Sequence, residues 1–204
     1  MARGKKGRRG WLRWARWSLI ALTPLCALNL AVAFFGSSMV FPLSPFFLRD
    51  KLSALGHYAW HRPHCLFAGH VSVDTEVARA EREHRLPRGL LAAIVEVESS
   101  GRVHRISSAG AMGPGQLMPG TARMLGVSDP FDPAQAIEGA GRYLAAQLAT
   151  FRDIRLAVAA YNAGPGSIVS RQVPRNGETE AYVRKVMSAY AERRGGASLR
   201  LATR

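Results

Sequence analysis

One carboxylic acid stands at a position where the surrounding pattern calls for an apolar core residue. Leu91, Ile94 and Val95 have the i, i+3, i+4 spacing that predicts the apolar face of a helix. Glu98 takes the next position on that face, whereas Glu96 lies off it. Burial disfavours the charged form of a carboxyl group, so we expect the pKa of Glu98 to be raised. A carboxyl group that keeps its proton near neutral pH can act as a general acid.

A glycine-rich run follows this glutamate. Residues that stop helices come directly after Glu98, and at Gly110, Gly113 and Gly115 the backbone can approach a ligand closely. Gln116 stands in the same run and offers a neutral donor and a neutral acceptor. These residue types fit a binding cleft beside the acid. The alternative is a helix whose last turn exposes Glu98 to solvent, followed by an ordinary loop.

Helical periodicity accounts for most of the chain around this run. Apolar residues recur at helical spacing in several segments, and no pair of segments has the alternation expected of paired strands. Asp132-Pro133 predicts a helix start, because a capping residue precedes a proline at the first position. Tyr161 lies on the apolar face of its helix, as Glu98 does. The fold class is therefore mostly α, with helices predicted over residues 73–84, 87–98, 119–126, 133–148, 154–163 and 178–191.

Short motifs occur in a fixed order along the same region. They are Glu98-Ser99, the S-x-x-G-A-x-G segment at 107–113, QLMPGTA at 116–122, AAYNAGPG at 159–166 and GETEAYVRKV at 177–186. Together they resemble the soluble lytic transglycosylase (SLT) domain family, which is related to goose-type lysozymes, over roughly residues 72 to 191. The family usually has Leu-Met where this chain has Pro114-Gly115. The sugar contact that the family makes with that methionine side chain is therefore not carried over to this chain.

The resemblance implies a lysozyme-like fold and a reaction on peptidoglycan that depends on one acid. In this family the glutamate at the position of Glu98 first protonates the oxygen of the leaving sugar. It then deprotonates the 6-hydroxyl of N-acetylmuramic acid (MurNAc), which closes on its own ring. Cleavage of the β-1,4 bond from MurNAc to N-acetylglucosamine (GlcNAc) thus yields 1,6-anhydro-MurNAc. No cofactor and no metal are implied.

Matching the motifs residue by residue adds five candidates for substrate binding. Tyr161 is expected to hydrogen-bond near the catalytic acid or to the N-acetyl group of the substrate, and Gln116 is expected to line the cleft. Ser99 either bonds the acid or caps the end of its helix. Asn162 either caps its own helix or binds sugar. For Tyr182, packing and substrate contact are both open.

No second carboxylate has a comparable claim to a catalytic role. Most glycosidases use two carboxyl groups, but the other acids examined fit helix caps, turns, first helical turns or a position off the apolar face. They are Asp129, Asp132, Asp153, Glu138, Glu178 and Glu180. Two alternatives remain open: a muramidase of the same fold that uses water, and a catalytically inactive peptidoglycan-binding module.

Positive charge is concentrated near the N-terminus. The 204-residue chain has a formal net charge of +14, of which residues 1–70 carry +9. The remaining +5 suits attraction to an anionic polymer such as a cell wall. The positive charge beside the membrane span is explained by the preference for Lys and Arg on the cytoplasmic side. We therefore expect no nucleic acid partner. Cys26 and Cys65 are too few for a disulfide framework.

An uncharged run follows the basic N-terminal segment. Residues 1–17 hold seven Lys or Arg and no acid, and residues 18–36 hold no charge. This pattern predicts a transmembrane signal-anchor in the bacterial inner membrane, with the N-terminus cytoplasmic and the catalytic domain periplasmic. The alternative is a signal peptide that is cleaved at the small residues Ala31 and Ala33. We favour a retained anchor, because the apolar run continues beyond that site.

Residues 37–70 are expected to form a linker, since Pro42 and Pro45 break any helix there. Four histidines and Cys65 raise a metal hypothesis, but they match no recognised ligand pattern, and a loop that packs on the domain is the favoured interpretation. The histidines are His57, His61, His64 and His70. The catalytic domain is expected over residues 71–192, followed by a basic tail over 193–204. Peptidoglycan strands, the membrane and envelope-machinery proteins are the expected partners.

Overall fold

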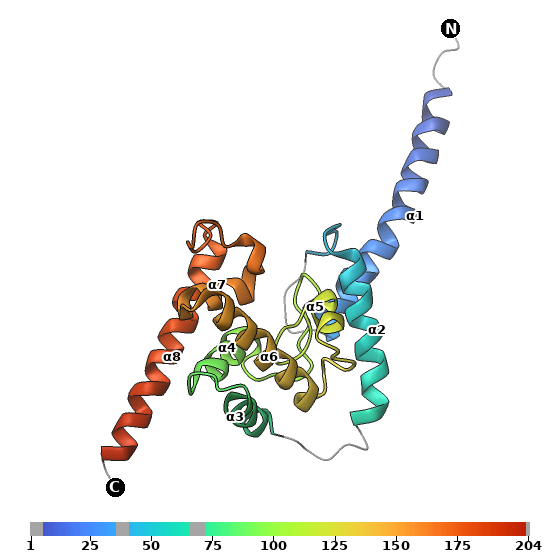
Figure 1. Ribbon diagram of the computed structural model, residues 1–204. Helices are drawn as coiled ribbons and strands as arrows, with labels where there is room; N and C mark the ends of the chain where they lie inside the picture. The colour runs from blue at the N-terminus through green and yellow to red at the C-terminus, as the bar shows by residue number, and fades with distance from the viewer. Residues whose placement is uncertain (1–5, 36–40, 66–71, 203–204) are drawn as a thin grey trace.

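A computed structural model describes residues 6–35, 41–65 and 72–202 (Figure 1). Within these ranges the regular structure is helical, and the extended pairing is limited to two isolated bridges, Ile106 with Met112 and Met112 with Leu117. The predicted fold class, mostly α, is confirmed. The helices are α1 (Lys6–Phe35), α2 (Leu48–Cys65), α3 (Val73–Glu83), α4 (Leu90–Ser99), α5 (Pro119–Met124), α6 (Pro133–Phe151), α7 (Ile154–Ala163), the 3-10 turn η1 (Pro165–Ser167) and α8 (Glu178–Ala202).

Helices α3, α4, α6, α7 and α8 enclose the main apolar core, and α4 lies inside it. α4 packs against α3, α6 and α8, while α6 also contacts α3 and α7. Leu90, Leu91 and Ile94 of α4 are fully buried, and Val183 and Val186 of α8 close over them. The helix that carries the candidate acid is therefore held by neighbours on several sides.

A second, smaller core joins α1 and α2 to the loops around α5. Val32 of α1, Ala54 of α2 and Phe131 are fully buried in it. The ring of Phe35 lies 5.4 Å from that of Tyr58, measured between centroids. The end of α1 is thus packed on the domain, while its beginning extends away from it (Figure 1).

Among the described residues, one segment is long and apolar enough to cross a membrane. It is Trp17–Phe35, with 19 residues and a mean hydropathy of 2.0. These bounds agree with the predicted span over residues 18–36, whose last residue, Gly36, lies outside the described part. The helix itself begins earlier, at Lys6, so the basic segment continues the same helix.

The prediction of a loop over residues 37–70 is wrong for Leu48–Cys65, which form α2. The buried face of α2 includes Lys51, Ala54 and His61 at helical spacing. Because two of these three residues are polar, apolar periodicity did not reveal the helix. Pro42 and Pro45 do precede it, as expected for helix breakers.

The C-terminal helix is also longer than predicted. α8 runs to Ala202, whereas the sequence predicts an end near Ala191 and a frayed tail from Arg193. Arg193 pairs with Glu96 of α4, and this contact favours continuation of the helix past the predicted end. The limits of the domains themselves stay predictions.

Candidate active site

Glu98 lies near the end of α4, and a neighbouring helix caps the start of α4. The helix begins later than the predicted Pro87, because Gly89 turns into it with a left-handed φ of 86°. Glu81 of α3 accepts hydrogen bonds from the backbone N–H of Gly89 (2.8 Å) and of Ala92 (3.2 Å). Such groups have no partner within a helix at its first turn. The two bonds fix α4, and Glu98 with it, against α3.

The surroundings of Glu98 favour the protonated carboxyl group. Burial raises its pKa from 4.5 to about 7, while the hydrogen bond from Tyr182 and the charge of Arg105 act in the opposite direction. The position near the C-terminal end of α4 also faces the negative end of the helix dipole, which disfavours a carboxylate. The predicted rise in pKa is confirmed. Glu98 can therefore both give and take a proton near neutral pH.

Two buried tyrosines approach the site from different helices. The hydroxyl of Tyr182 on α8 donates to Oε1 of Glu98 at 2.7 Å. Tyr161 on α7 donates to the carbonyl oxygen of Gly115 at 2.8 Å, and its ring centroid lies 5.3 Å from that of Tyr143. Burial, followed by the charge of Glu98, raises the pKa of both Tyr161 and Tyr182 well above the usual value. Both phenols therefore keep their protons and act as donors.

The segment that departs from the family pattern is tied to the helices on both sides. Ser99 Oγ lies 2.9 Å from the carbonyl oxygen of Pro114 and 3.1 Å from that of Val95. Tyr161 holds the following carbonyl, that of Gly115. A Cβ atom added to Gly115 would lie 3.0 Å from the Cβ of Ala140 and 3.5 Å from the Tyr161 hydroxyl. The absence of a side chain at this position thus lets the loop lie close to α6 and α7.

Gln116 stabilises the same loop from within. Its backbone has a φ of 48°, and its Nε2 donates to the carbonyl oxygens of Gly113 (2.8 Å) and Arg105 (3.2 Å). Both donor hydrogens of the amide are used in these bonds, which leaves its oxygen as the group that can meet a ligand. The structure thus shows Gln116 positioning the loop.

Arg105 is a charged neighbour of Glu98 that the sequence analysis did not select. Its side chain is half-buried, and its Nε atom makes no hydrogen bond among the described residues. Burial is the main cause that lowers the pKa of Arg105, and the charge of Glu98 raises it. The guanidinium therefore stands ready to stabilise negative charge on Glu98. Its position in the loop, off any helical face, gave no periodic signal.

Asn162 and Glu96 lie apart from this network. Asn162 is exposed in the last turn of α7, and its side chain makes no hydrogen bond within the described residues. Glu96 is exposed and pairs with Arg193, as expected for a residue off the apolar face. Ser99, Gln116, Tyr161 and Tyr182 gather around Glu98 and its loop, and substrate binding by them stays a prediction.

The other acids have structural partners. Asp132 caps α6 by accepting from the N–H of Gln135 at 2.9 Å, and Asp153 caps α7 by accepting from that of Leu156 at 2.9 Å. Glu138 pairs with His84 at 2.8 Å. Glu178 and Glu180 stand in the first turn of α8. The expected cap and first-turn roles are confirmed for these residues, apart from Glu138, whose partner was not foreseen.

Asp129 is a turn residue, as expected, but it also binds α2. Its Oδ1 accepts from the N–H of Phe131 at 3.0 Å, and its Oδ2 lies 2.6 Å from Nδ1 of His61. Nε2 of His61 lies 3.2 Å from Nε2 of His104. The buried His61 therefore connects α2 to the loops of the domain.

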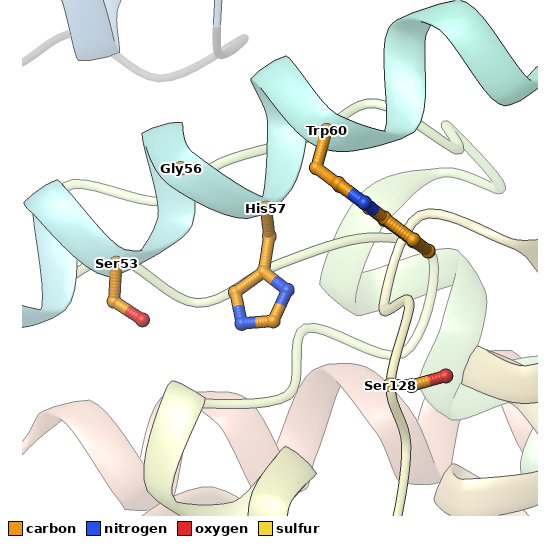
Figure 2. A pocket seen from close by; sticks show the side chains of 5 residues that line it. All are labelled: Ser53, Gly56, His57, Trp60 and Ser128. Atoms are coloured by element: carbon orange, nitrogen blue, oxygen red, sulfur yellow. The ribbon is translucent and has the colours of Figure 1, made fainter.

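The histidines of the metal hypothesis do not converge in the part of the chain that is described. No group of three or more His, Cys, Asp or Glu side chains suited to a metal is found there. His57 faces a separate open pocket of about 410 Å³ between α2 and the loop at Ser128 (Figure 2). Ser53, Gly56 and Trp60 complete its lining, which contains no carboxyl group. His70 and the side chains of His64 and Cys65 lie outside the described part.

The fold and the site together define a helical domain in which one acid, Glu98, has a raised pKa and accepts a hydrogen bond from Tyr182. The family model "Transglycosylase SLT domain" matches residues 76–184, which is more than half of the chain. The chain belongs to this family. The matched region contains Glu98, the glycine-rich loop and both tyrosines.

The chain spans less than half the length of the relatives that it matches. A protein named transglycosylase from Enterobacteria phage PRD1 is 37% identical over 111 residues, which are 54% of this chain and 40% of that protein. A protein from Alkalilimnicola ehrlichii named membrane-bound lytic murein transglycosylase F 2 is 37% identical over 106 residues, which are 48% of this chain and 24% of that protein. Membrane-bound lytic murein transglycosylase F of Stutzerimonas stutzeri is 31% identical over 131 residues, covering 58% of this chain and 26% of that protein.

A solved structure supports the lysozyme-like fold that the resemblance implies. It is the X-ray structure of an inactive glutamate-to-glutamine mutant of lytic transglycosylase Slt from Pseudomonas aeruginosa. The TM-score is 0.51 at 28% sequence identity, and the match covers 57% of this chain and 23% of the other.

Proposed function

We propose that this chain is a peptidoglycan lytic transglycosylase that cleaves the β-1,4 bond between MurNAc and GlcNAc, with Glu98 as acid and base. The observation that carries the proposal is the buried Glu98 carboxyl group, whose pKa lies at about 7 and whose Oε1 accepts from Tyr182. Membership of the SLT family and relatives named lytic murein transglycosylases support the reaction class. In the Slt protein of Pseudomonas aeruginosa, one glutamate-to-glutamine mutant is described as inactive.

The chemistry needs one residue in two protonation states. Protonated Glu98 gives its proton to the glycosidic oxygen, the bond to C1 of MurNAc breaks, and GlcNAc leaves. The Glu98 carboxylate then faces the positive charge at C1, and it takes the proton of the 6-hydroxyl as O6 bonds to C1. Tyr182 and Arg105 stabilise the carboxylate stage, since each lowers the pKa of Glu98. The attacking hydroxyl belongs to the reacting sugar, so its effective concentration is high.

The product decides between the candidate activities. Purified full-length chain is expected to release muropeptides that end in 1,6-anhydro-MurNAc, which mass spectrometry distinguishes from hydrolysis products by the loss of one water. Reducing MurNAc ends would identify a muramidase instead. Binding to peptidoglycan without any release of sugar would identify an inactive binding module.

For localisation, we propose a retained single-pass anchor with the domain in the periplasm. Names of two relatives include "membrane-bound", and α1 carries the apolar segment. Cleavage after Ala33 would remove Asn29 and Val32, which are both fully buried, and would leave the buried amine of Lys51 without its acceptor Asn29. Retention of α1 avoids this loss. Recovery of the mature protein in the soluble periplasmic fraction would contradict it.

A further inference from the structure

A turn rich in exposed apolar residues lies between α1 and α2. Residues 41–48 form it, and we call it the aromatic turn. Phe41, Phe46 and Phe47 are 72%, 70% and 54% exposed, and Leu52 in the next turn of α2 is 60% exposed. Large apolar side chains this close together on a surface mark a contact with lipid or protein.

The depth of this turn relative to α1 is fixed by hydrogen bonds. Asn29 of α1 donates through Nδ2 to the carbonyl oxygen of Ser44 at 3.0 Å. Lys51 of α2 donates through Nζ to Oδ1 of Asn29 at 2.7 Å, and lies 3.4 Å from the hydroxyl of Ser44. The centre of the aromatic turn is therefore level with Asn29 and not with the end of α1 at Phe35.

The apolar span Trp17–Phe35 is only about as long as the hydrocarbon layer is thick. Its 19 residues rise by roughly 28 Å as a helix, which is about the thickness of the hydrocarbon layer. An outward shift of the span would draw Arg13 and Arg16 into hydrocarbon, at high cost. Asn29 then lies about 9 Å inside the outer end of the span, at 1.5 Å per residue. Ser44, whose carbonyl oxygen accepts from Asn29, lies at the same level along α1.

We propose that the aromatic turn is embedded in the outer leaflet beside α1 and fastens the domain to the membrane surface. This inference rests on the proposed anchor, and lipid is the occupant because Ser44 of the turn is hydrogen-bonded to Asn29 within the span. Polar backbone is tolerated at such a depth only where it is satisfied within the protein. The structure meets this condition at Ser44, whose carbonyl oxygen accepts from Asn29 and whose N–H donates to Phe41 O at 3.0 Å.

Two further features of the turn suit this environment. Pro42 and Pro45 carry no N–H group, so the turn has fewer donors to satisfy than its length implies. Arg49 is exposed to the surroundings of the protein in the first turn of α2. If its backbone lies within the membrane, its long side chain can still reach the anionic lipid headgroups. Anchoring at both α1 and the aromatic turn prevents the domain from swinging freely on a single helix.

Depth-dependent quenching tests the inference in the full chain. Cys26 and Cys65 are replaced by Ser, and one fluorophore is attached through Phe46→Cys in vesicles of phosphatidylethanolamine and phosphatidylglycerol. Bromine on the lipid acyl chains is expected to quench this label strongly, and aqueous iodide is expected to have little effect. Because Phe46 is exposed, its replacement leaves the packing intact.

Two matched positions make the result decisive. A label at Leu22→Cys reports on the span, and a label at Ala78→Cys, exposed on α3, reports on the solvated domain and is expected to be quenched by iodide. Lipid quenching at Leu22 with iodide quenching at Phe46 would overturn the inference and leave the anchor intact. Iodide quenching at both would overturn the anchor too, without touching the proposed catalysis. A Phe46 label shielded from both quenchers would mean a protein contact, which also overturns it.

Discussion

Glu98 and Lys51 are both ionisable groups withdrawn from water, but their surroundings differ. The amine of Lys51 is fully buried, and its donors are directed to Asn29 and to two oxygen atoms of Ser44. Glu98 keeps partial exposure, accepts from Tyr182 at one oxygen, and has the uncommitted Nε of Arg105 nearby. A buried charge whose bonds are complete holds helices together. A buried acid that still meets solvent can meet a substrate.

The largest expected effect comes from removing the acid. Glu98→Gln keeps the size of the side chain but has no proton to give, so release of muropeptides should fall by roughly 10³-fold or more. Mass spectrometry of digested peptidoglycan measures the loss. Glu96→Gln is the control, because Glu96 is exposed and paired with Arg193. Near-normal release by the Glu98→Gln variant would remove Glu98 from the mechanism.

The same variant has a signature in stability. Folded Glu98 has a pKa of about 7, whereas 4.5 is the ordinary value. The folded state therefore binds more protons than the unfolded state between these values, and stability falls as pH rises through this window. Glu98→Gln removes the penalty, so at pH 8 it should unfold less readily than the wild type, by about 3 kcal/mol. Denaturation at pH 4 and pH 8 should show the difference only at pH 8.

The next effect concerns the buried bond between α1 and α2. Asn29→Leu leaves the amine of Lys51 without its closest acceptor and should weaken the packing of α2 by about 3 kcal/mol, because an unsatisfied buried charged group is costly. Adding Lys51→Met removes that charge, so the double variant should recover part of the loss. Hydrogen exchange of α2 amides in vesicles reports the free energies. Purely additive losses would show that the two side chains are not coupled.

The difference between Glu98 and Lys51 also explains why the sequence predicted the candidate acid but did not predict α2. Glu98 was visible because it interrupts a regular apolar stripe, and its motif matches a family. α2 was missed because Lys51 and His61 hold buried positions with partners, Asn29 and Asp129, that are distant in sequence. Polar pairs of this kind carry no periodic signal before the fold is known.

The supporting residues around the acid show the same limit. For Tyr182 the sequence left packing and substrate contact open, and the structure shows a direct hydrogen bond to Glu98. Arg105 was not selected, because its position in a loop gives no periodic signal. Ser99 was expected to bond the acid or cap its helix, and its hydroxyl lies within hydrogen-bonding distance of the carbonyl oxygens of Val95 in that helix and of Pro114. Motif matching identifies which residues gather, and only geometry assigns their partners.

A smaller effect is expected when the hydrogen bond to the acid is removed. Wild-type activity should fall as pH rises through about 7, since protonated Glu98 is lost. The bond from Tyr182 lowers the pKa of Glu98, so Tyr182→Phe should move this descending limb upward by about one pH unit. Tyr143→Phe is the control, because Tyr143 touches Tyr161 and not Glu98. An unmoved limb in Tyr182→Phe would show that the bond does not hold in solution.

The smallest shift is expected from Arg105. Its charge lowers the pKa of Glu98 less than the Tyr182 bond does, so Arg105→Met should move the descending limb upward by less than Tyr182→Phe. Arg123→Met removes the same charge from an exposed position on α5, and it should leave the limb in place. Because Arg105 is half-buried, its effect should survive added salt better than that of a surface charge. A downward shift in Arg105→Met, or an equal shift in Arg123→Met, would show that Arg105 does not act on Glu98 through its charge.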